Sequence, residues 1–197
     1  MSVVSKLLER AVARQLVDYL RSSNLLPPYQ SGFRAGHSTE TAVLRVLSDL
    51  LLAVDSGVYA ALVLLDLSAA FDTVDHAILL KRLQTSFGLN GPVLNWFRSY
   101  LSDRSQHVRR GASRSLSSQL KCGVPQGSVL GPILFILYIA GLTGLVERHG
   151  LCPHQYADDT QIYGSSPPTA VEELRQRLSA CADDVASWIH ANRLQLN

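Results

Sequence analysis

Cysteine is scarce in this sequence. The three cysteines, Cys122, Cys152 and Cys181, lack the short spacings of a metal-binding cluster, and their odd number leaves one thiol unpaired in any disulfide scheme. We therefore expect no disulfide partner, and an intracellular, reducing location fits best. The first residues also lack a charged leader followed by an apolar segment, so no secretory signal is expected.

Net charge is low as well. A balance of +2 indicates no charged partner by itself. Internal repeats and low-complexity segments are absent, and the clusters of Pro and Ser are typical of turns rather than linkers. A chain of 197 residues with 47% hydrophobic content is long enough to bury a core, and we expect one domain.

One long stretch without charge, Val129–Val146, has the length of a membrane span. It contains Pro132 and three glycines, and the polar segment Gly123–Ser128 leads into it. These features favour a buried core helix that begins near Ser128 over a membrane-spanning helix, which is the alternative. We therefore expect no membrane partner.

Apolar residues recur at helical spacing in two N-terminal segments. The first helix, with Val4 and Leu8 on its apolar face, is predicted to end at Asn24, and a structured loop over residues 25–38 follows. Ser38 or Thr39 then caps a second helix. Its predicted apolar face is formed by Val43, Leu47, Leu50, Leu51 and Val54.

Capping signals predict three further helices. Asp72 or Asp75 caps a helix that runs through Leu83, and Asn90 with Pro92 opens another. Near the end of the chain, Thr169 and Glu172 have the spacing of a capping box for a final helix.

Two short apolar runs predict strands. The run "YAALVLLDL" is too short and too continuously apolar for a surface helix, so it predicts a buried central strand from about Tyr59 to Leu67. The stretch "YADDTQIY" predicts a short hairpin with Asp158 and Asp159 at its tip. If these strands are neighbours, Asp66, Asp158 and Asp159 meet at one edge of a sheet.

Such a carboxylate cluster needs compensation, because like charges a few ångströms apart raise one another's pKa. Hard oxygen ligands suit Mg²⁺, and two ions about 3.5–4 Å apart clamp the attacking and leaving oxygens of a phosphoryl transfer. The alternative is structural: Asp-Asp before Thr is ordinary turn chemistry, and Asp66 caps the segment that follows it.

Three motifs decide between these interpretations. In this order, "LLDLSAAFDTVDH", "CGVPQGSVLGPILFILYI" and "YADDTQIY" resemble the palm motifs of reverse transcriptases, closest to those of non-LTR (LINE-type, jockey-like) retrotransposons. The segments "SVVSKLLERAVARQL" and "YQSGFRAGHSTETAV" are similar to those that precede the motifs in that family. The resemblance therefore covers essentially the whole chain.

The resemblance implies an α+β fold. Its centre is a polymerase palm, an antiparallel sheet backed by helices, with a partial and mostly helical fingers region and no thumb. Residues 59–83 and 122–197 correspond to the palm, and about 1–58 and 84–121 to fingers-like or connecting parts. The family's Arg-Pro-Ile type segment before this sequence and its hairpin and thumb after "LQLN" are not included, and Ala140-Gly141 replaces a more usual Asn-Asp.

The resemblance also implies a site. Asp66, Asp158 and Asp159 match the catalytic, metal-binding carboxylates, with Asp66 and Asp158 as principal ligands of two Mg²⁺ ions for which Mn²⁺ can substitute. Residues implied in dNTP binding are Phe71, which excludes a 2′-hydroxyl, the loop residues Gln126 and Gly127, and Arg34. For Phe71 a place in the core, and for Arg34 a solvated loop position, remain alternatives.

Basic residues gather in one segment. Between Arg98 and Lys121 there are six basic residues against the single acid Asp103, so this segment carries +5 in a chain whose total is +2. Residues 106–110 and 116–122 predict a hairpin here, and phosphate contacts are expected from its cations, with a solvated hairpin as the alternative. The nucleic-acid-binding candidates are Arg104, Arg109, Arg110, Arg114 and Lys121.

The implied function is that of an RNA-directed DNA polymerase core. It would transfer dNMP from a dNTP to the 3′-hydroxyl of a DNA primer on an RNA template, with weak or no activity in this segment without its flanks. A non-catalytic, retrotransposon-derived remnant that binds RNA is the alternative. Phe71 disfavours an RNA-dependent RNA polymerase, and the resemblance to target-primed retrotransposons implies action in the nucleus.

Overall fold

The computed structural model describes residues 3–197, and the chain forms two compact units. We call residues 3–25 and 71–138 the helical unit, and residues 26–70 and 139–197 the sheet unit. Each is described by itself.

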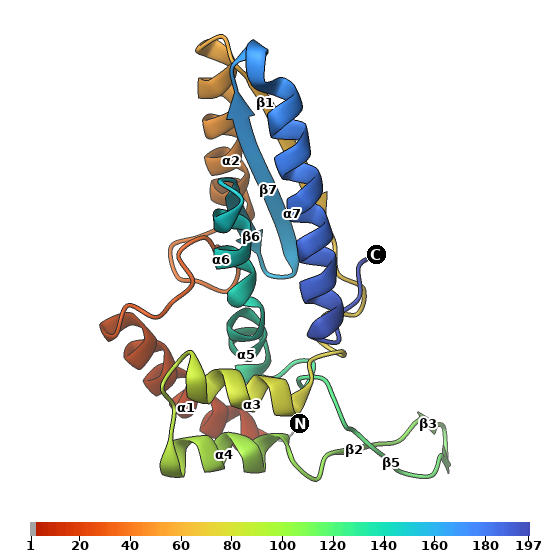
Figure 1. Cartoon of the computed structure of the whole chain (residues 1–197). Coiled ribbons are helices and arrows are strands. Elements are labelled where there is room, and N and C mark those ends of the chain that lie inside the picture. The colour runs from red at the N-terminus through yellow and green to blue at the C-terminus, as the bar shows by residue number, and fades with distance from the viewer. Residues whose placement is uncertain (1–2) are drawn as a thin grey trace. The chain divides into compact units, whose positions relative to one another are not determined.

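The helical unit contains α1 (Val3–Ser22), α3 (His76–Thr85), α4 (Gly91–Leu101) and all but the last residue of α5 (Leu130–Ile139) (Figure 1). Asp75 caps α3 as predicted, because its carboxylate accepts from the backbone N–H of Ile78 at 2.9 Å. Pro92 lies in the first turn of α4, where its missing N–H leaves no hydrogen bond unmade. The core of this unit is rich in fully buried large side chains: Leu79, Leu83, Phe97, Leu101, Leu130 and Leu134.

The predicted basic hairpin is confirmed, as two short antiparallel ladders in the helical unit. The inner ladder pairs β2 (Ser105–Gln106) with β5 (Ser118–Gln119), and the outer ladder pairs β3 (Arg109–Arg110) with β4 (Ser113–Arg114). Every residue from 105 to 119 is exposed.

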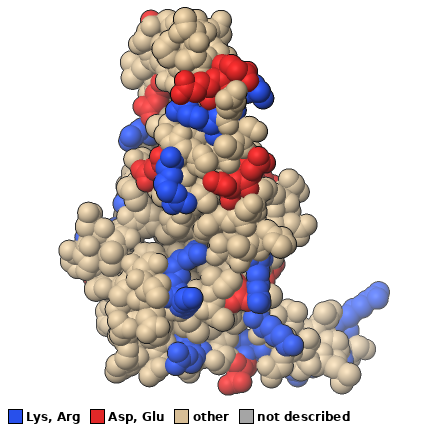
Figure 2. Space-filling view, viewed as in Figure 1, with Lys and Arg blue, Asp and Glu red and all other residues tan. Residues whose placement is uncertain are grey.

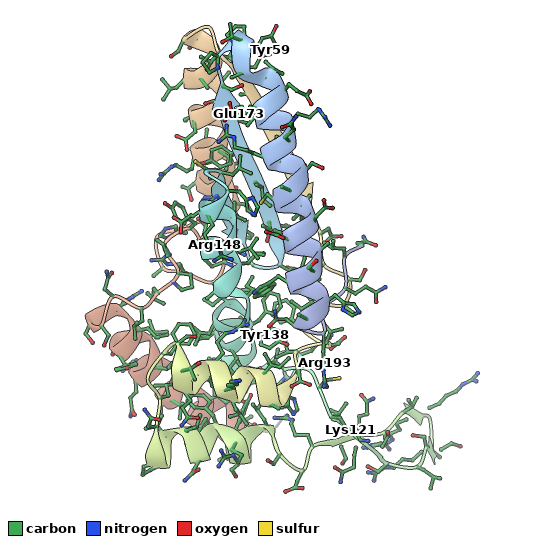
Figure 3. All side chains as sticks on the ribbon, in the orientation of Figure 1. Tyr59, Lys121, Tyr138, Arg148, Glu173 and Arg193 are labelled. Carbon is green, nitrogen blue, oxygen red and sulfur yellow. The ribbon has the colours of Figure 1, made fainter. Side chains whose placement is uncertain are left out.

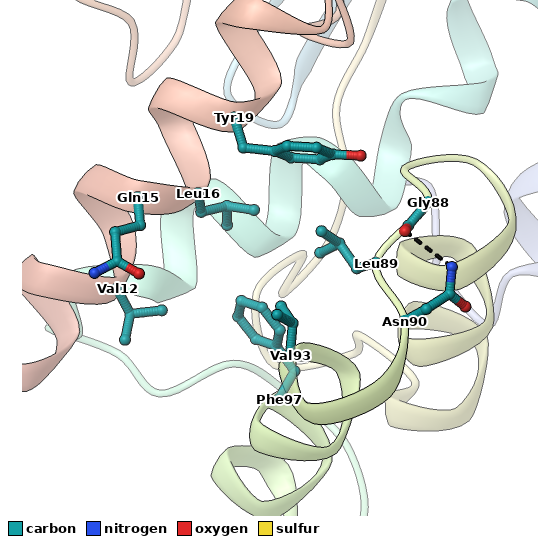
Figure 4. A pocket seen from close by; sticks show the side chains of 9 residues that line it. All are labelled: Val12, Gln15, Leu16, Tyr19, Gly88, Leu89, Asn90, Val93 and Phe97. Carbon is teal, nitrogen blue, oxygen red and sulfur yellow. Dashed lines mark hydrogen bonds between the residues drawn. The ribbon is translucent and has the colours of Figure 1, made fainter.

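A cavity of about 460 Å³ lies between α1 and the segment that leads into α4 (Figure 4). The hydroxyl of Tyr19 closes one side by donating to the carbonyl of Phe87 at 2.9 Å. The lining is mostly apolar and consists of Val12, Gln15, Leu16, Tyr19, Gly88, Leu89, Asn90, Val93 and Phe97. None of the site residues predicted above belongs to this lining.

The sheet unit is built on one antiparallel sheet with the strand order β1-β7-β6. The strands are β1 (Tyr59–Leu65), β6 (Cys152–Tyr156) and β7 (Asp159–Ser166). The helical elements of the unit are α2 (Thr39–Asp55), α6 (Gly141–Arg148), the 3₁₀ turn η1 (Pro168–Ala170) and α7 (Val171–Ala191), and α7 runs along β7 in Figure 1.

Helices lie on both faces of this sheet. The hydroxyl of Tyr163 donates to the carboxylate of Asp49 on α2 at 2.6 Å. The next residue, Gly164, points to the opposite face, where a Cβ atom would lie 3.3 Å from Leu174 on α7. The alternation along β7 therefore directs α2 to one face and α7 to the other.

The apolar segment over α5 and α6 is mostly interior. Leu130–Arg148 is long and apolar enough to cross a membrane, but 67% of its apolar window is buried within the structure. Leu134, Phe135, Leu137 and Tyr138 are fully buried. This burial agrees with the core-helix interpretation.

Three predicted apolar faces are wrong. Strand β1 is at the edge of the sheet rather than its centre, and Tyr59 (Figure 3), Leu62 and Leu64 are exposed. On α2 the buried residues are Ala42 and Val46, whereas the predicted face is mostly exposed at Val43, Leu47, Leu51 and Val54. On α1 Val4 and Leu8 are exposed, and the buried side carries Glu9, Ala13, Leu16 and Leu20.

The physical reason is that burial depends on which elements pack beside a helix or strand, and on both helices the buried side includes a small residue, Ala13 on α1 and Ala42 on α2. The spacing of apolar residues alone does not indicate which element packs against a given face of a helix.

The two predicted helix caps at Ser38 and Thr169 have different outcomes. Ser38 caps α2, with its hydroxyl accepting from the N–H of Thr41 at 3.2 Å. The capping box at Thr169 does not form, because Thr169 lies inside the 3₁₀ turn that follows Pro167. Glu172 instead accepts from the guanidinium of Arg175 on α7, at 2.9 Å from Nε.

Glu9 provides a buried cap for α5 from another helix. Only 2% of it is exposed, and its Oε2 accepts from the backbone N–H groups of Val129 at 2.7 Å and Leu130 at 3.3 Å. These N–H groups have no partner within the helix because they lie at its start. A negative charge at a helix N-terminus is also favourable.

We expect Glu9→Ala to lower the free energy of unfolding by about 2–3 kcal/mol, because it leaves buried N–H groups of α5 unsatisfied. Urea unfolding followed by circular dichroism measures this change. Asp18→Asn removes a charge from an exposed position of the same helix, and its effect should stay within about 0.5 kcal/mol. Equal effects of the two changes would contradict the capping role of Glu9.

Candidate active site

Three carboxylates meet at one end of the sheet. The register pairs Leu65 of β1 with Thr160 of β7, so the next residues, Asp66 and Asp159, lie opposite each other. Asp158 precedes Asp159 in the turn that joins β6 to β7. The condition set in the sequence analysis, that this strand and the hairpin are neighbours, is therefore met.

The three carboxylates influence one another electrostatically. The pKa of Asp159 is raised above its ordinary range, first by partial burial and then by the negative charges of Asp158 and Asp66. Asp66 and Asp159 are exposed and Asp158 is half-buried. Solvent therefore reaches the cluster.

The C-terminal residues pair with the chain beside Asp66. Asn197 donates from its side chain to Oδ2 of Asp66 at 2.8 Å and from its backbone N–H to the carbonyl of Asp66 at 3.0 Å. The N–H of Ser68 donates to the carbonyl of Gln195 at 2.8 Å. Sequence reasoning missed these contacts, since no local pattern in "LQLN" points to Asp66.

The donor set suits a hard divalent cation. Carboxylate oxygens are the ligands that Mg²⁺ and Mn²⁺ favour, and such a cation would offset the negative charges of Asp158 and Asp66, which after partial burial contribute to the raised pKa of Asp159. Within residues 3–197, no group of three Asp, Glu, His or Cys side chains already has the geometry of a closed metal site.

Phe71, Gln126 and Gly127 belong to the helical unit. Phe71 is half-buried, and its ring centroid lies 4.5 Å from that of Phe135. Gln126 is exposed, and its Nε2 lies 3.1 Å from both carboxylate oxygens of Asp72. Gly127 has a φ of +74°, a left-handed conformation that favours glycine at this turn.

Backbone hydrogen bonds bring this second group of residues together. The N–H of Val124 donates to the carbonyl of Phe71 at 2.8 Å, which ties the loop before α5 to the segment that carries Phe71 and Asp72. Asp72 is a partner of Gln126 that the sequence analysis did not identify. The packing of Phe71 on Phe135 agrees with the core alternative, although Phe71 is only half-buried.

Arg34 lies in the sheet unit. Its Nη1 donates to the carbonyls of Pro27 at 2.8 Å and Gln30 at 3.1 Å. The guanidinium therefore braces the loop that precedes α2, and both the nucleotide-binding role and the solvated-loop alternative for Arg34 stay predictions.

The basic candidates lie on and around the hairpin. Arg109, Arg110 and Arg114 are exposed on its strands, and Lys121 is exposed just beyond β5 (Figure 3). Figure 2 shows Lys and Arg side chains projecting from this part of the chain. Arg104 differs, because it is half-buried, donates to the carbonyl of Tyr100 at 3.1 Å and lies 5.3 Å above the Tyr100 ring.

Comparison with protein-family models matches residues 1–197 to the family described as reverse transcriptase (RNA-dependent DNA polymerase). A curated relative, the probable RNA-directed DNA polymerase from transposon BS of Drosophila melanogaster, is 35% identical over 100% of this chain and 22% of its own length. The RNA-directed DNA polymerase from mobile element jockey of Drosophila funebris is 31% identical over 94% of this chain and 20% of its length. This chain therefore spans about a fifth of these relatives.

Solved telomerase structures share the fold. Apo telomerase from Candida tropicalis is similar with a TM-score of 0.66 at 14% sequence identity. The aligned region covers 98% of this chain and 36% of the telomerase chain. Telomerase from Candida albicans, in complex with a TWJ fragment of telomeric RNA, is similar with a TM-score of 0.63 at 15% sequence identity. The aligned region again covers 98% of this chain, and it covers 34% of the telomerase chain. With the antiparallel sheet and its helices, these similarities confirm the expected α+β, palm-like fold.

The coupling of Asp159 predicts a pH-dependent effect on stability. A carboxyl pKa that is raised by folding means that ionisation opposes the folded state. This destabilisation by the ionised carboxylate is absent at pH values below the ordinary pKa of Asp and is fully present at pH values above the raised pKa of Asp159. Asp159→Asn should therefore raise the melting temperature by a few degrees at most at pH 7, with the difference vanishing near pH 3.

Thermal unfolding at several pH values measures this difference. Asp183→Asn, at an exposed position on α7, is the control for loss of one negative charge. A gain for Asp159→Asn that persists unchanged into acid would show that ionisation of Asp159 is not its cause.

Proposed function

The chain belongs to the reverse transcriptase (RNA-dependent DNA polymerase) family, and we propose that it forms the catalytic core of an RNA-directed DNA polymerase. The reaction is transfer of dNMP from a dNTP to the 3′-hydroxyl of a DNA primer annealed to an RNA template. The observation that carries this proposal is the convergence of Asp66, Asp158 and Asp159 at one end of the antiparallel sheet.

Family membership implies dependence on divalent metal ions in general. We assign two Mg²⁺ ions, with Mn²⁺ as a substitute, to Asp66, Asp158 and Asp159. When bound, the ions supply positive charge that lowers the pKa of the primer 3′-hydroxyl and stabilises the departing pyrophosphate. The carboxylates hold that charge, and Asn197 helps to orient Asp66 through the hydrogen bond at 2.8 Å.

The second group of residues is assigned to the incoming dNTP. Phe71 excludes the 2′-hydroxyl of a ribonucleotide, and its packing on Phe135 supports this role because it limits movement of the ring. Gln126 and Gly127 contact the nucleotide from the loop before α5, with Gln126 held by Asp72. Arg34 is likewise assigned to dNTP binding, and its hydrogen bond to the carbonyl of Pro27 stabilises the loop that carries it.

Nucleic acid is bound mainly through its backbone. Arg104, Arg109, Arg110, Arg114 and Lys121 provide phosphate contacts that are independent of sequence and weakened by salt. Base pairing between template and incoming nucleotide supplies the sequence information. Action in the nucleus is proposed by resemblance to target-primed retrotransposons.

A primer-extension assay with an RNA template, a DNA primer, dNTPs and Mg²⁺ tests the polymerase assignment. We expect the Asp158→Asn, Asp159→Asn double variant to lose incorporation by about 10²–10³-fold or more, because it removes the charges that hold the metal ions. Asp183→Asn is the control. Equal incorporation by the double variant and the unmodified chain would refute the assignment of these carboxylates.

A different result would favour the alternative function. If the chain binds RNA, fails to bind Mn²⁺ and incorporates no nucleotide, it is a non-catalytic RNA-binding module derived from a retrotransposon.

The assignment of Phe71 is tested by nucleotide selection. Phe71→Val and Phe71→Ala should raise the ratio of rNTP to dNTP incorporation by roughly tenfold or more, because space opens for the 2′-hydroxyl. Phe33→Ala, at an exposed aromatic position of the sheet unit, is the control. Unchanged selection in a folded, active Phe71 variant would assign this residue to the core alone.

A further inference from the structure

The outer edge of β6 is paired with the loop that precedes α2. Residue Gln155 of β6 donates from its N–H to the carbonyl of Tyr29 at 2.8 Å and accepts at its carbonyl from the N–H of Ser31 at 2.8 Å. These bonds form a parallel bridge around Gln30. The segment Tyr29–Gly32 therefore extends the sheet next to the turn that carries Asp158.

The side chain of Gln30 reaches from this segment into that turn. Its Oε1 accepts from the N–H of Ala157 at 2.9 Å and from the N–H of Gly32 at 2.7 Å, and its Nε2 donates to the carbonyl of Ala157 at 3.1 Å. Only 1% of Gln30 is exposed. One buried amide thus satisfies both backbone polar groups of the residue that precedes Asp158.

Ala157 needs such support. Its φ of +56° lies in the left-handed region, which is unfavourable for a residue with a Cβ atom, and only 8% of it is exposed. A strained conformation persists only when the surroundings determine it. Here the surroundings are the amide of Gln30 and the backbone at Gly32, where an added Cβ atom would lie 2.3 Å from the nitrogen of Ala157.

We infer that Gln30 is a positioning residue for the carboxylate pair Asp158-Asp159. Its three hydrogen bonds hold Ala157 in the left-handed conformation and thereby set the direction in which the chain presents the next two carboxylates. This inference rests on the proposed function, because it assigns Gln30 to the metal affinity of that same site. Supporting contacts of metal ligands commonly change affinity by about 10–100-fold when they are removed.

A buried glutamine also has a purely structural role, and the chain offers a matched control for it. Gln155 is equally buried, at 1% exposure, and lies on β6 itself. Its side chain contacts the hydroxyls of Thr143 at 3.4 Å and Thr160 at 3.3 Å, not Ala157. Comparing Gln30→Met with Gln155→Met separates loss of a buried amide from loss of the hold on Ala157.

The experiment combines two measurements on the whole chain. Mn²⁺ titration, followed by the electron paramagnetic resonance signal of the free ion, measures metal affinity, and amide hydrogen exchange by nuclear magnetic resonance measures protection of the Ala157 N–H. Gln30→Met should weaken Mn²⁺ binding by roughly tenfold or more and raise exchange at Ala157. Gln155→Met should lower thermal stability comparably and change Mn²⁺ affinity by less than about twofold.

Two further variants keep the test decisive. Gln30→Asn retains a buried amide, but its side chain is one methylene too short to reach Ala157. It should therefore weaken Mn²⁺ binding as well, and it replaces Gln30→Met in the test if that variant does not fold. Ala157→Gly relieves the left-handed strain, because glycine adopts a positive φ without a steric cost. Added to Gln30→Met or Gln30→Asn, it should restore part of the Mn²⁺ affinity.

The outcomes separate this inference from the proposed function. Mn²⁺ affinity and Ala157 exchange that remain unchanged in folded Gln30 variants would overturn the inference while leaving the carboxylate assignment intact. If the unmodified chain itself binds no Mn²⁺, or binds it equally after Asp158→Asn, Asp159→Asn, the proposed metal site is wrong. The inferred role in metal affinity then falls with it, whereas exchange at Ala157 still reports whether Gln30 holds the turn.

Discussion

The antiparallel ladder between β1 and β7 places Asp66 opposite Asp159, and the cluster of three carboxylates in the sheet unit depends on that register. A slip by one residue would send alternate side chains to the opposite face of the sheet and separate the two carboxylates. The register is supported from the other side of β7 by β6 and, beyond β6, by the loop at Gln30. The site is therefore fixed by a sheet whose strands come from distant parts of the chain.

The same arrangement concentrates negative charge, and the structure shows the consequence. Asp159 has a raised pKa because it is partly buried beside Asp158 and Asp66. Ala157 is held in a left-handed conformation immediately before the pair. Electrostatic repulsion and backbone strain thus occur within three consecutive residues, which is typical of a functional site rather than of an ordinary turn.

Sequence patterns predicted several elements correctly because their causes are local. Ser38 and Asp75 cap helices through contacts only three residues away. The hairpin at Asp158-Asp159 and the basic hairpin also depend on turns between adjacent strands. The exposed faces of α1, α2 and β1 were missed because burial depends on which elements pack beside them. The capping box at Thr169 failed for a related reason, since the preceding prolines form a 3₁₀ turn.

In the sequence itself, residue types and short spacings indicated the helix caps and the hairpins, while the resemblance of the ordered motifs to those of reverse transcriptases implied the α+β class and the three carboxylates. Only the tertiary structure determined that Asn197 binds Asp66, that Asp72 holds Gln126 and that Gln30 holds Ala157. In each of these pairs the partners are more than fifty residues apart. No local periodicity records such a contact, since it exists only after strand pairing and helix packing have brought the two segments together.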